Sequence, residues 1–227
     1  MLVLLDCADN IQTTELRWGR VEYFIHAVRD PLEMIVSAYL YHLRGAEGWV
    51  HVPLYDLDKR QESRLGTKWP ARFVVNRSLS YFNFLQAANT QAGLLQVADD
   101  MLSGPISNMD AVARLADKST YIVRMEDCIL DFDGTFERMF RHINASGEDL
   151  TTSLKMAGVF DLKRHPHSPS AIQWIDNGSH VSDPLAKPPL YDLLSHEEHY
   201  CNRIRDSQKL HGYQPMVCLI RAQYSLS

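Results

Sequence analysis

Apolar residues along this chain fall into short continuous runs and into stripes of helical period. Residues 21–28 (VEYFIHAV) are nearly all apolar over the length of one strand, which is typical of a strand covered on both faces in a parallel sheet. The runs 2–6 (LVLLD) and 121–125 (YIVRM) also have strand length. Together these three runs predict a small buried sheet.

The best-marked helix start follows the run 21–28 directly. Asp30 is a suitable capping residue, Pro31 fits the first helical position, and Glu33 gives a spacing similar to a capping box. Apolar residues then recur at helical period as far as Leu43, so a strand, a tight turn and a helix follow one another as in the first half of a βαβ unit.

Further periodic segments predict four more helices, over 78–101, 109–116, around 136–143, and 190–210 with Gly212 as its stop. The irregular stretch 45–68 and the polar stretch 159–189 are expected to be loops. Strands that alternate with helices indicate an α/β fold in which helices outnumber strands. The length of 227 residues fits one domain, 1–227, with a sizeable core.

Composition and charge narrow the function classes. The net charge of −5 excludes a general basic surface for nucleic acid but allows a local basic pocket for a small anion. No apolar run reaches the length of a membrane helix, and residues 1–10 lack the basic flank of a signal peptide, so the chain as written is expected to be soluble. The four cysteines are widely spread without a CxxC pair, so we expect buried thiols rather than two disulfides.

Arg29 and Ser37 are the candidate binding residues. Ligands of open parallel sheets sit beyond the carboxyl ends of the strands, where Arg29 offers a planar set of donors for a phosphate. Ser37 faces about 120° away from the apolar stripe of its helix, so its hydroxyl is available to the same phosphate. The alternatives are an arginine paired with a nearby carboxylate and a serine that is only solvated.

The string VRDPLEMIVSAYLYH, residues 28–42, resembles the 3′-phosphate-binding segment of sulfotransferases that use 3′-phosphoadenosine-5′-phosphosulfate (PAPS). The resemblance implies a P-loop-like parallel sheet flanked by helices, and it implies that Arg29 and Ser37 hold the 3′-phosphate. Tyr39 and His42 also match the motif, without an assigned contact. Residues 121–143 and the last helix, ending in LHGY, are similar to later family segments in the same order, so the resemblance spans about 21–213.

Two departures from the family pattern concern the mechanism. The family's loop for the 5′-phosphosulfate, with Lys, Gly and Ser or Thr after the first strand, has no counterpart here, and only 28 residues precede Arg29. Met125 also stands where many relatives have Tyr. The chain is therefore expected to be truncated at its N-terminus or to be a diverged member. It either transfers a sulfuryl group to a hydroxyl or amine, or is an inactive fragment or pseudoenzyme acting as a binding or interaction module. A kinase of this fold would need a GxxxxGK[ST] loop, which the sequence lacks.

Other candidate residues carry weaker signals. By the resemblance, Lys163 and Arg164 belong to a cationic loop that closes over the 3′-phosphate; the alternative is a solvated turn. A catalytic base is not identified among His42, His165, His167 and His180. The two histidines of His196-Glu-Glu-His199 are three residues apart, which does not match HExxH, so no metal is expected.

Several properties stay open at this stage. The acceptor is a sugar, a protein tyrosine, a lipid or a small alcohol, with no nucleic acid expected as a partner. The compartment is the cytoplasm or, for an anchored parent protein, the Golgi lumen. In that lumen the Asn-x-Ser sequons at Asn76, Asn144 and Asn177 would be glycosylation sites.

Overall fold

The computed structural model of the chain describes the backbone of residues 3–6 and residues 23–45, 47–53, 79–161, 163–164 and 183–219. The chain divides into two compact units. The first comprises residues 1–29 and 108–181, and the second comprises residues 30–107 and 182–227. The chain therefore passes from one unit to the other three times, and neither unit is a contiguous piece of sequence. The expectation of a single domain stays a prediction.

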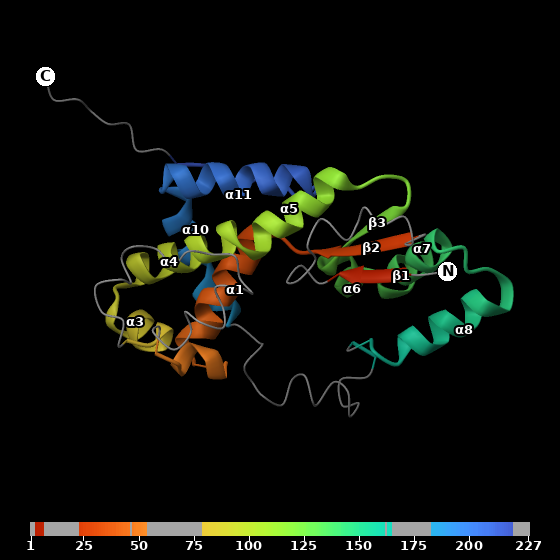
Figure 1. Cartoon of the computed structure of the whole chain (residues 1–227), viewed down its shortest axis with the longest axis horizontal. Coiled ribbons are helices and arrows are strands. Elements are labelled where there is room, and N and C mark those ends of the chain that lie inside the picture. The colour runs from red at the N-terminus through yellow and green to blue at the C-terminus, as the bar shows by residue number, and fades with distance from the viewer. Residues whose placement is uncertain are drawn as a thin grey trace, which may run out of the picture. The chain divides into compact units, whose positions relative to one another are not determined.

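A parallel sheet of three strands forms the centre of the first unit (Figure 1). Its strands are β1 (Val3–Asp6), β2 (Tyr23–Val28) and β3 (Thr120–Arg124), in the order β1-β2-β3. In register, Val3 lies opposite Tyr23 and Phe24 opposite Thr120. The near-continuous apolar run predicted a strand covered on both faces, and β2 is the central strand, with Phe24, Ile25 and Val28 buried. The three predicted strands are confirmed.

The described helices of the first unit come before and after β3 in the chain. They are most of α5 (Pro105–Leu115), α6 (Met125–Leu130), α7 (Phe132–His142) and α8 (Gly147–Gly158). The sequence predicts α5 and α7 but not α6 or α8, and β3 ends one residue earlier than predicted because α6 begins at Met125. Buried His26 of β2 lies with its Nε2 3.3 Å from the carbonyl oxygen of Met109, which links the sheet to α5.

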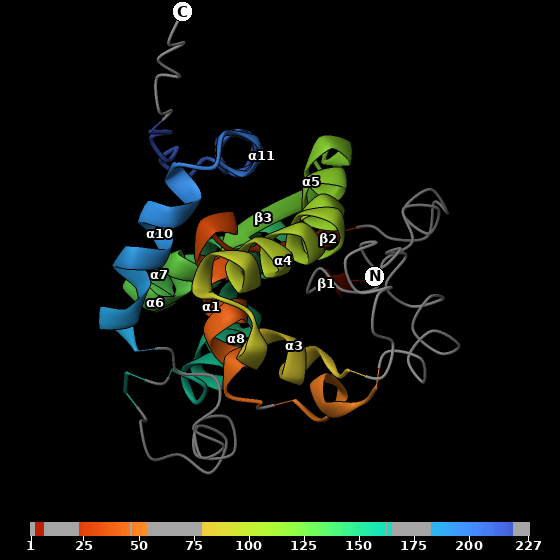
Figure 2. The ribbon, with the colours of Figure 1, turned by 90° about the vertical axis from the view of Figure 1, so that its left-hand side faces the viewer.

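In its described residues, the second unit consists of helices and the segments that join them. Its helices are α1 (Pro31–Leu43), the 3₁₀ helix η2 (Gly48–His51), α3 (Tyr81–Ala87), α4 (Thr90–Ser103), the 3₁₀ helix η4 (Pro184–Ala186), α10 (Lys187–Ser195) and α11 (Glu198–Leu210). Helix α1 packs against α3, α4, α10 and α11 (Figure 2). The predicted helix at 30–43 is confirmed, and so is the helix-rich α/β class. In the described part of the chain, no helix combines the length and the apolar character needed to cross a membrane.

Two predicted long helices are in fact pairs of shorter ones. The segment 78–101 breaks at Ala88 and Asn89, because the Asn89 side chain accepts the N–H of Ala92 at 2.8 Å and starts a new helix. The segment 190–210 breaks at His196 and Glu197, between α10 and α11. Apolar periodicity continues through both breaks, so it could not reveal them.

The stop predicted at Gly212 is confirmed. Gly212 has φ +73°, a left-handed conformation that suits glycine, and the N–H of Tyr213 donates to the carbonyl of Gln208 at 2.8 Å. The chain then turns back, and Cys218 forms a disulfide with Cys201 of α11. The expectation of buried thiols is therefore wrong for these two cysteines, since the spacing of cysteines in sequence does not reveal a reversal of the chain.

Cys128 in α6 is a free thiol, as expected, and its half-burial raises the pKa of the thiol, with nearby Asp127 adding to the effect. Cys7, residues 54–78 and most of the polar stretch 159–189 lie outside the described residues. The loop expected over 45–68 contains η2 in its described part.

Candidate functional site

Arg29 stands at the carboxyl edge of the parallel sheet. Val28, the last residue of β2, lies opposite Arg124 of β3, and Arg29 follows Val28 directly. Arg29 is half-buried, and its guanidinium carries donors in a fixed planar arrangement that suits an oxyanion. The strand that precedes Arg29 is central and buried, as the sequence predicts.

Arg124 is a second arginine at this edge, and sequence reasoning did not single it out. Its guanidinium binds the carboxylate of Asp127 through two hydrogen bonds, from Nε at 2.9 Å and from Nη2 at 3.0 Å. Such a two-point contact neutralises the arginine locally. The spacing of three residues between Arg124 and Asp127, where a strand passes into a helix, is the sequence signal for this pair. The structure therefore gives Arg124 a carboxylate partner within its own segment.

The start of α1 is fixed by Asp30. Its Oδ1 accepts the N–H of Leu32 at 2.9 Å, and Pro31 occupies the first helical position, as predicted. The same Oδ1 accepts a hydrogen bond from Nε2 of Gln208 in α11 at 2.9 Å. Two donors thus hold the residue that directly follows Arg29.

Ser37 lies on α1 and is half-buried, whereas Ile35, Val36 and Tyr39 of the apolar stripe are buried. Arg29 is the last residue of the first unit's N-terminal part, and Ser37 belongs to the second unit. Their convergence on one phosphate stays a prediction.

Glu33, expected in a spacing similar to a capping box, binds two residues of α10. Its carboxylate accepts a hydrogen bond from Lys187 Nζ at 2.7 Å and another from the hydroxyl of Tyr191. Glu33 therefore connects α1 to α10 within the second unit.

Lys163 and Arg164 follow α8 in the first unit. The Arg164 guanidinium forms ion pairs with Asp133 at 2.5 Å and Asp161 at 2.9 Å and lies 5.9 Å from the centre of the Phe132 ring. The hydrogen bond to Asp133 raises the pKa of Arg164. Lys163 is exposed, and its backbone N–H donates to Asp161 Oδ1 at 2.9 Å. A phosphate at Arg164 would compete with two carboxylates, and the role of both residues as a loop over the 3′-phosphate stays a prediction.

His42 lies among aromatic rings of the second unit. Its ring contacts Trp49 at 5.1 Å and Tyr81 at 5.4 Å, both edge-on, and its Nε2 is 3.7 Å from Glu47. Its Nδ1 is buried and has no hydrogen-bond partner among the described residues. These contacts favour a packing role over that of a catalytic base. His165, His167 and His180 lie outside the described residues.

His196 and His199 lie in different surroundings. His196 contacts the carbonyl of Leu219 and the carboxylate of Asp192, and His199 packs edge-on against Tyr200. Within the residues that the structure describes, no group of three or more His, Cys, Asp or Glu side chains is arranged to hold a metal ion.

A buried polar set in the second unit was not predicted. The hydroxyl of Tyr81, 1% exposed, donates to Asp100 Oδ2 at 2.8 Å, and Gln96 Nε2 donates to Asp100 Oδ1 at 3.1 Å. Burial raises the pKa of Asp100 to about 7, against the lowering effect of these hydrogen bonds. The sequence signal is an Asp on the inner side of an amphipathic helix.

The chain was compared with known protein families, curated proteins and solved structures. No protein-family model, no curated protein and no solved structure matches the chain significantly.

Proposed function

We propose that the chain is a sulfotransferase-like protein that binds the adenosine 3′,5′-bisphosphate part of PAPS, with Arg29 and Ser37 holding the 3′-phosphate. One observation carries the proposal: Arg29 follows the central strand of a parallel sheet and directly precedes a capped helix. This strand-turn-helix boundary is the context that the motif over 28–42 requires. A P-loop-like sheet belongs to the same proposal.

In this proposal Arg29 supplies positive charge and two parallel donors to the phosphate, and Ser37 supplies one hydroxyl donor. Both residues bind and orient the nucleotide. In the reaction, the bond between sulfur and the bridging oxygen of the phosphosulfate breaks while the acceptor oxygen or nitrogen bonds to sulfur. The acceptor proton passes to a base, and the catalysis consists mainly of positioning and charge stabilisation. The acceptor is a carbohydrate, a protein or a small molecule.

A second candidate function is that of a binding or interaction module without turnover. It is favoured by the sequence that follows β1, which reads CADNIQTTEL and contains neither Lys nor Gly. A loop at that carboxyl end is where backbone N–H groups and a lysine would hold the 5′-phosphosulfate. A single arginine does not hold both ends of the donor.

Thermal unfolding with adenosine 3′,5′-bisphosphate tests the binding step. At 100 times the dissociation constant, the free energy of unfolding should rise by about 2.7 kcal/mol, with a higher Tm. Arg29→Ala should abolish the shift and Ser37→Ala should reduce it. Arg141→Ala, which removes an exposed pair with Glu137 in α7, is the matched control and should keep it.

Adenosine 5′-monophosphate, which lacks the 3′-phosphate, should shift the Tm far less. An unchanged Tm in the intact protein, or equal shifts with both nucleotides, contradicts the proposal. Transfer of labelled sulfate from PAPS to a mixture of acceptors then separates the two candidate functions, because reproducible turnover excludes the inactive module.

A further inference from the structure

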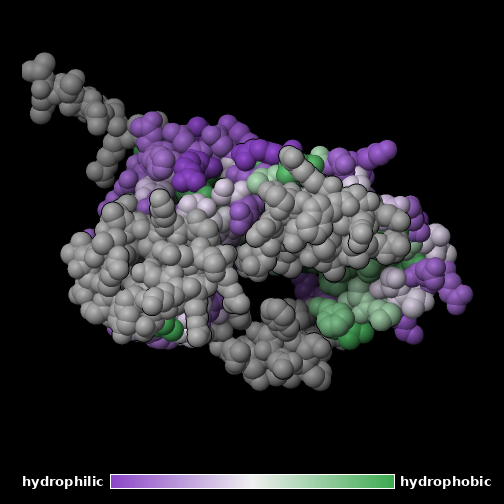
Figure 3. Space-filling view, in the orientation of Figure 1, coloured by the Kyte–Doolittle hydropathy of each residue, from purple (hydrophilic) through white to green (hydrophobic). Residues whose placement is uncertain are grey.

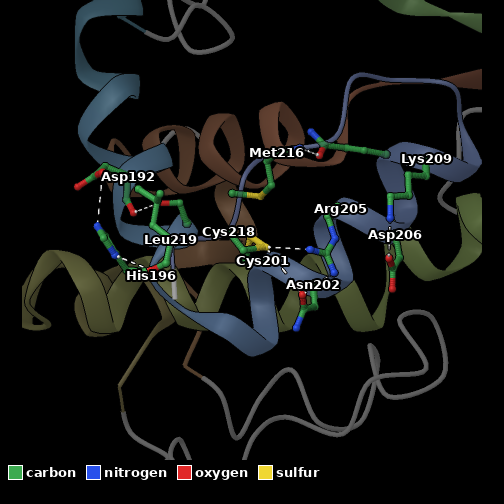
Figure 4. The surroundings of a disulfide bond; sticks show 12 residues. Asp192, His196, Cys201, Asn202, Arg205, Asp206, Lys209, Met216, Cys218 and Leu219 are labelled. Atoms are coloured by element: carbon green, nitrogen blue, oxygen red, sulfur yellow. Dashed lines mark hydrogen bonds and ion pairs between the residues drawn. A yellow bond between two sulfur atoms is a disulfide. The ribbon is translucent and has the colours of Figure 1, made fainter. Parts of the chain in front are cut away.

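The segment after α11 is fastened to the helices of the second unit at three places (Figure 4). Cys218 forms a disulfide with Cys201, which is fully buried in α11. The N–H of Leu219 donates to the carbonyl of Ser195 at 2.8 Å, and His196 Nδ1 lies 3.0 Å from the carbonyl of Leu219. Closer to α11, the N–H of Met216 donates to Oε1 of Gln208 at 2.7 Å. We call residues 213–219 the C-terminal strap.

Gln208 connects the strap to the start of α1. Its side chain is 1% exposed, so both of its polar atoms need partners inside the protein. Oε1 accepts the Met216 N–H, and Nε2 donates to Oδ1 of Asp30 at 2.9 Å. That oxygen also accepts the N–H of Leu32 and caps α1. A continuous row of hydrogen bonds therefore runs from the strap to the residue next to Arg29.

From this connection we infer that Gln208 is a positioning residue for the start of α1, and that the Cys201–Cys218 disulfide controls this positioning as a redox-sensitive clasp. The disulfide holds the strap, the strap fixes one end of the Gln208 amide, and the other end fixes Asp30. Opening the disulfide removes the covalent hold on the strap, so the Met216 N–H separates from Gln208 more often and the cap loosens. The effect on the nucleotide rests on the proposed function, whereas the coupling between strap and cap does not.

The clasp opens by exchange with a dithiol reductant. One thiolate of the reductant attacks the sulfur of Cys218, which is more exposed than Cys201; the S–S bond breaks, and Cys201 leaves and takes a proton. The second thiol of the reductant attacks the mixed disulfide, and Cys218 is released as a thiol. Two electrons and two protons thus pass from the dithiol, which becomes a cyclic disulfide. Arg205, with Nη1 3.7 Å from Cys218 Sγ, stabilises the Cys218 thiolate that departs in this second step.

Amide hydrogen exchange without any nucleotide tests the coupling. Dithiothreitol, or the Cys201→Ser/Cys218→Ser double variant, should speed exchange of the Met216 and Leu32 amides by about tenfold or more. The Gly134 amide, which Asp131 caps at the start of α7, is the internal control and should not change. Cys128→Ser should respond to dithiothreitol as the unaltered chain does. Faster exchange at Met216 with unchanged exchange at Leu32 overturns the inference.

Substitution of Gln208 tests its role without touching the disulfide. Gln208→Glu keeps an acceptor for Met216 but replaces the donor to Asp30 by an oxygen, so the Leu32 amide should exchange faster while the Met216 amide keeps its protection. Asp30→Asn combined with Gln208→Glu restores a donor and an acceptor in exchanged places and should recover the protection of Leu32. If the pair recovers nothing, or if Gln208→Glu leaves Leu32 unchanged, the positioning role is wrong.

The affinity for adenosine 3′,5′-bisphosphate is the final measurement. Reduction and Gln208→Glu should each weaken binding by about tenfold, the size expected from the loss of one charge-assisted hydrogen bond. If the oxidised chain binds no nucleotide at all, the proposed function fails, and the exchange data still decide the coupling. If the nucleotide binds equally well in both redox states, the clasp does not act on the site.

Discussion

The two units differ in where large apolar side chains meet water: in the second unit the most exposed ones described, Leu185 and Val217, lie outside α1, α4, α10 and α11. In the second unit, side chains from α1, α4, α10 and α11 are fully buried, among them Ile35, Leu94, Leu194 and Ile204. In the first unit, the described chain leaves large apolar side chains exposed on α6 and around the end of α8, namely Ile129, Leu130, Met156, Val159 and Phe160. Figure 3 shows part of this surface in green near the end of α8.

The two units also differ in their polar contacts and covalent links. The second unit has the disulfide, the contact of Glu33 with Lys187 and Tyr191, and the buried carboxyl of Asp100. The Arg141–Glu137 pair of the first unit lies largely in solvent, where a pair contributes little. We therefore expect substitutions on α6 and around the end of α8 to cost much less stability than substitutions at the buried positions of α1, α4, α10 and α11.

Truncation of one isoleucine in each unit should give the largest difference. Ile35→Ala removes a side chain that is 0% exposed and should lower the free energy of unfolding by about 2–5 kcal/mol. Ile129→Ala removes one that is 61% exposed and should change it by less than about 0.5 kcal/mol. Chemical denaturation of both variants measures the two values. Similar losses would mean that Ile129 is covered in solution.

The pH dependence of stability should show the next largest effect. The pKa of Asp100 is about 7 in the folded chain and near 3.8 when unfolded, so the folded state holds an extra proton between these values. Stability from this group is complete below about pH 4 and is lost as the pH rises to about 7, by on the order of 4 kcal/mol at most. Asp100→Asn should remove this slope.

Denaturation of the unaltered chain and of Asp100→Asn at several pH values from 4 to 8 gives the free energy of unfolding of each. The contributions of the other titrating groups cancel in the difference between the two chains. Tyr81→Phe is a second probe. It removes a hydrogen bond that favours the ionised carboxylate, so it should move the end of the slope to higher pH. Parallel curves for the unaltered chain and Asp100→Asn would show that Asp100 ionises normally.

Two glutamates give the smallest expected effects and refine the comparison. Glu33→Gln weakens a partly buried contact with Lys187 and Tyr191 and should cost about 1 kcal/mol or more. Glu137→Gln weakens an exposed pair with Arg141 one helical turn away and should cost about 0.5 kcal/mol or less. Denaturation at low and high salt measures both. Equal losses in the free energy of unfolding would show that these two ion-pair contacts do not differ in strength between the units.

Sequence reasoning succeeds where one short segment carries the whole signal. The run before Arg29 identifies the central strand, Asp30 and Pro31 identify the start of α1, and Gly212 identifies the end of α11. It fails where contacts between distant segments determine the structure. The breaks at Asn89 and Glu197 interrupt an apolar period that continues across them, and the Cys201–Cys218 pairing needs the reversal of the chain after α11.

In the candidate site, too, local features are predictable from the sequence and contacts between distant segments are not. Arg29 at the end of a buried strand is predictable because strand and arginine adjoin in sequence. The contact of Gln208 with Asp30, or of Arg164 with Asp133, is not, because tertiary packing chooses these partners. A sequence motif can thus mark a position for binding, while the residues that hold this position come from far along the chain.

The interleaving of the two units also bears on how the molecule folds. Strands β2 and β3 pair directly, yet the whole stretch from Asp30 to Ser107 separates them along the chain. Closing so long an unstructured loop costs entropy before any strand contact forms, whereas helices of that stretch arise from local contacts and bring its ends closer. We expect the helical stretch to condense first and the parallel sheet to assemble late, so mutations in α1 and α4 should slow refolding more than mutations in β3.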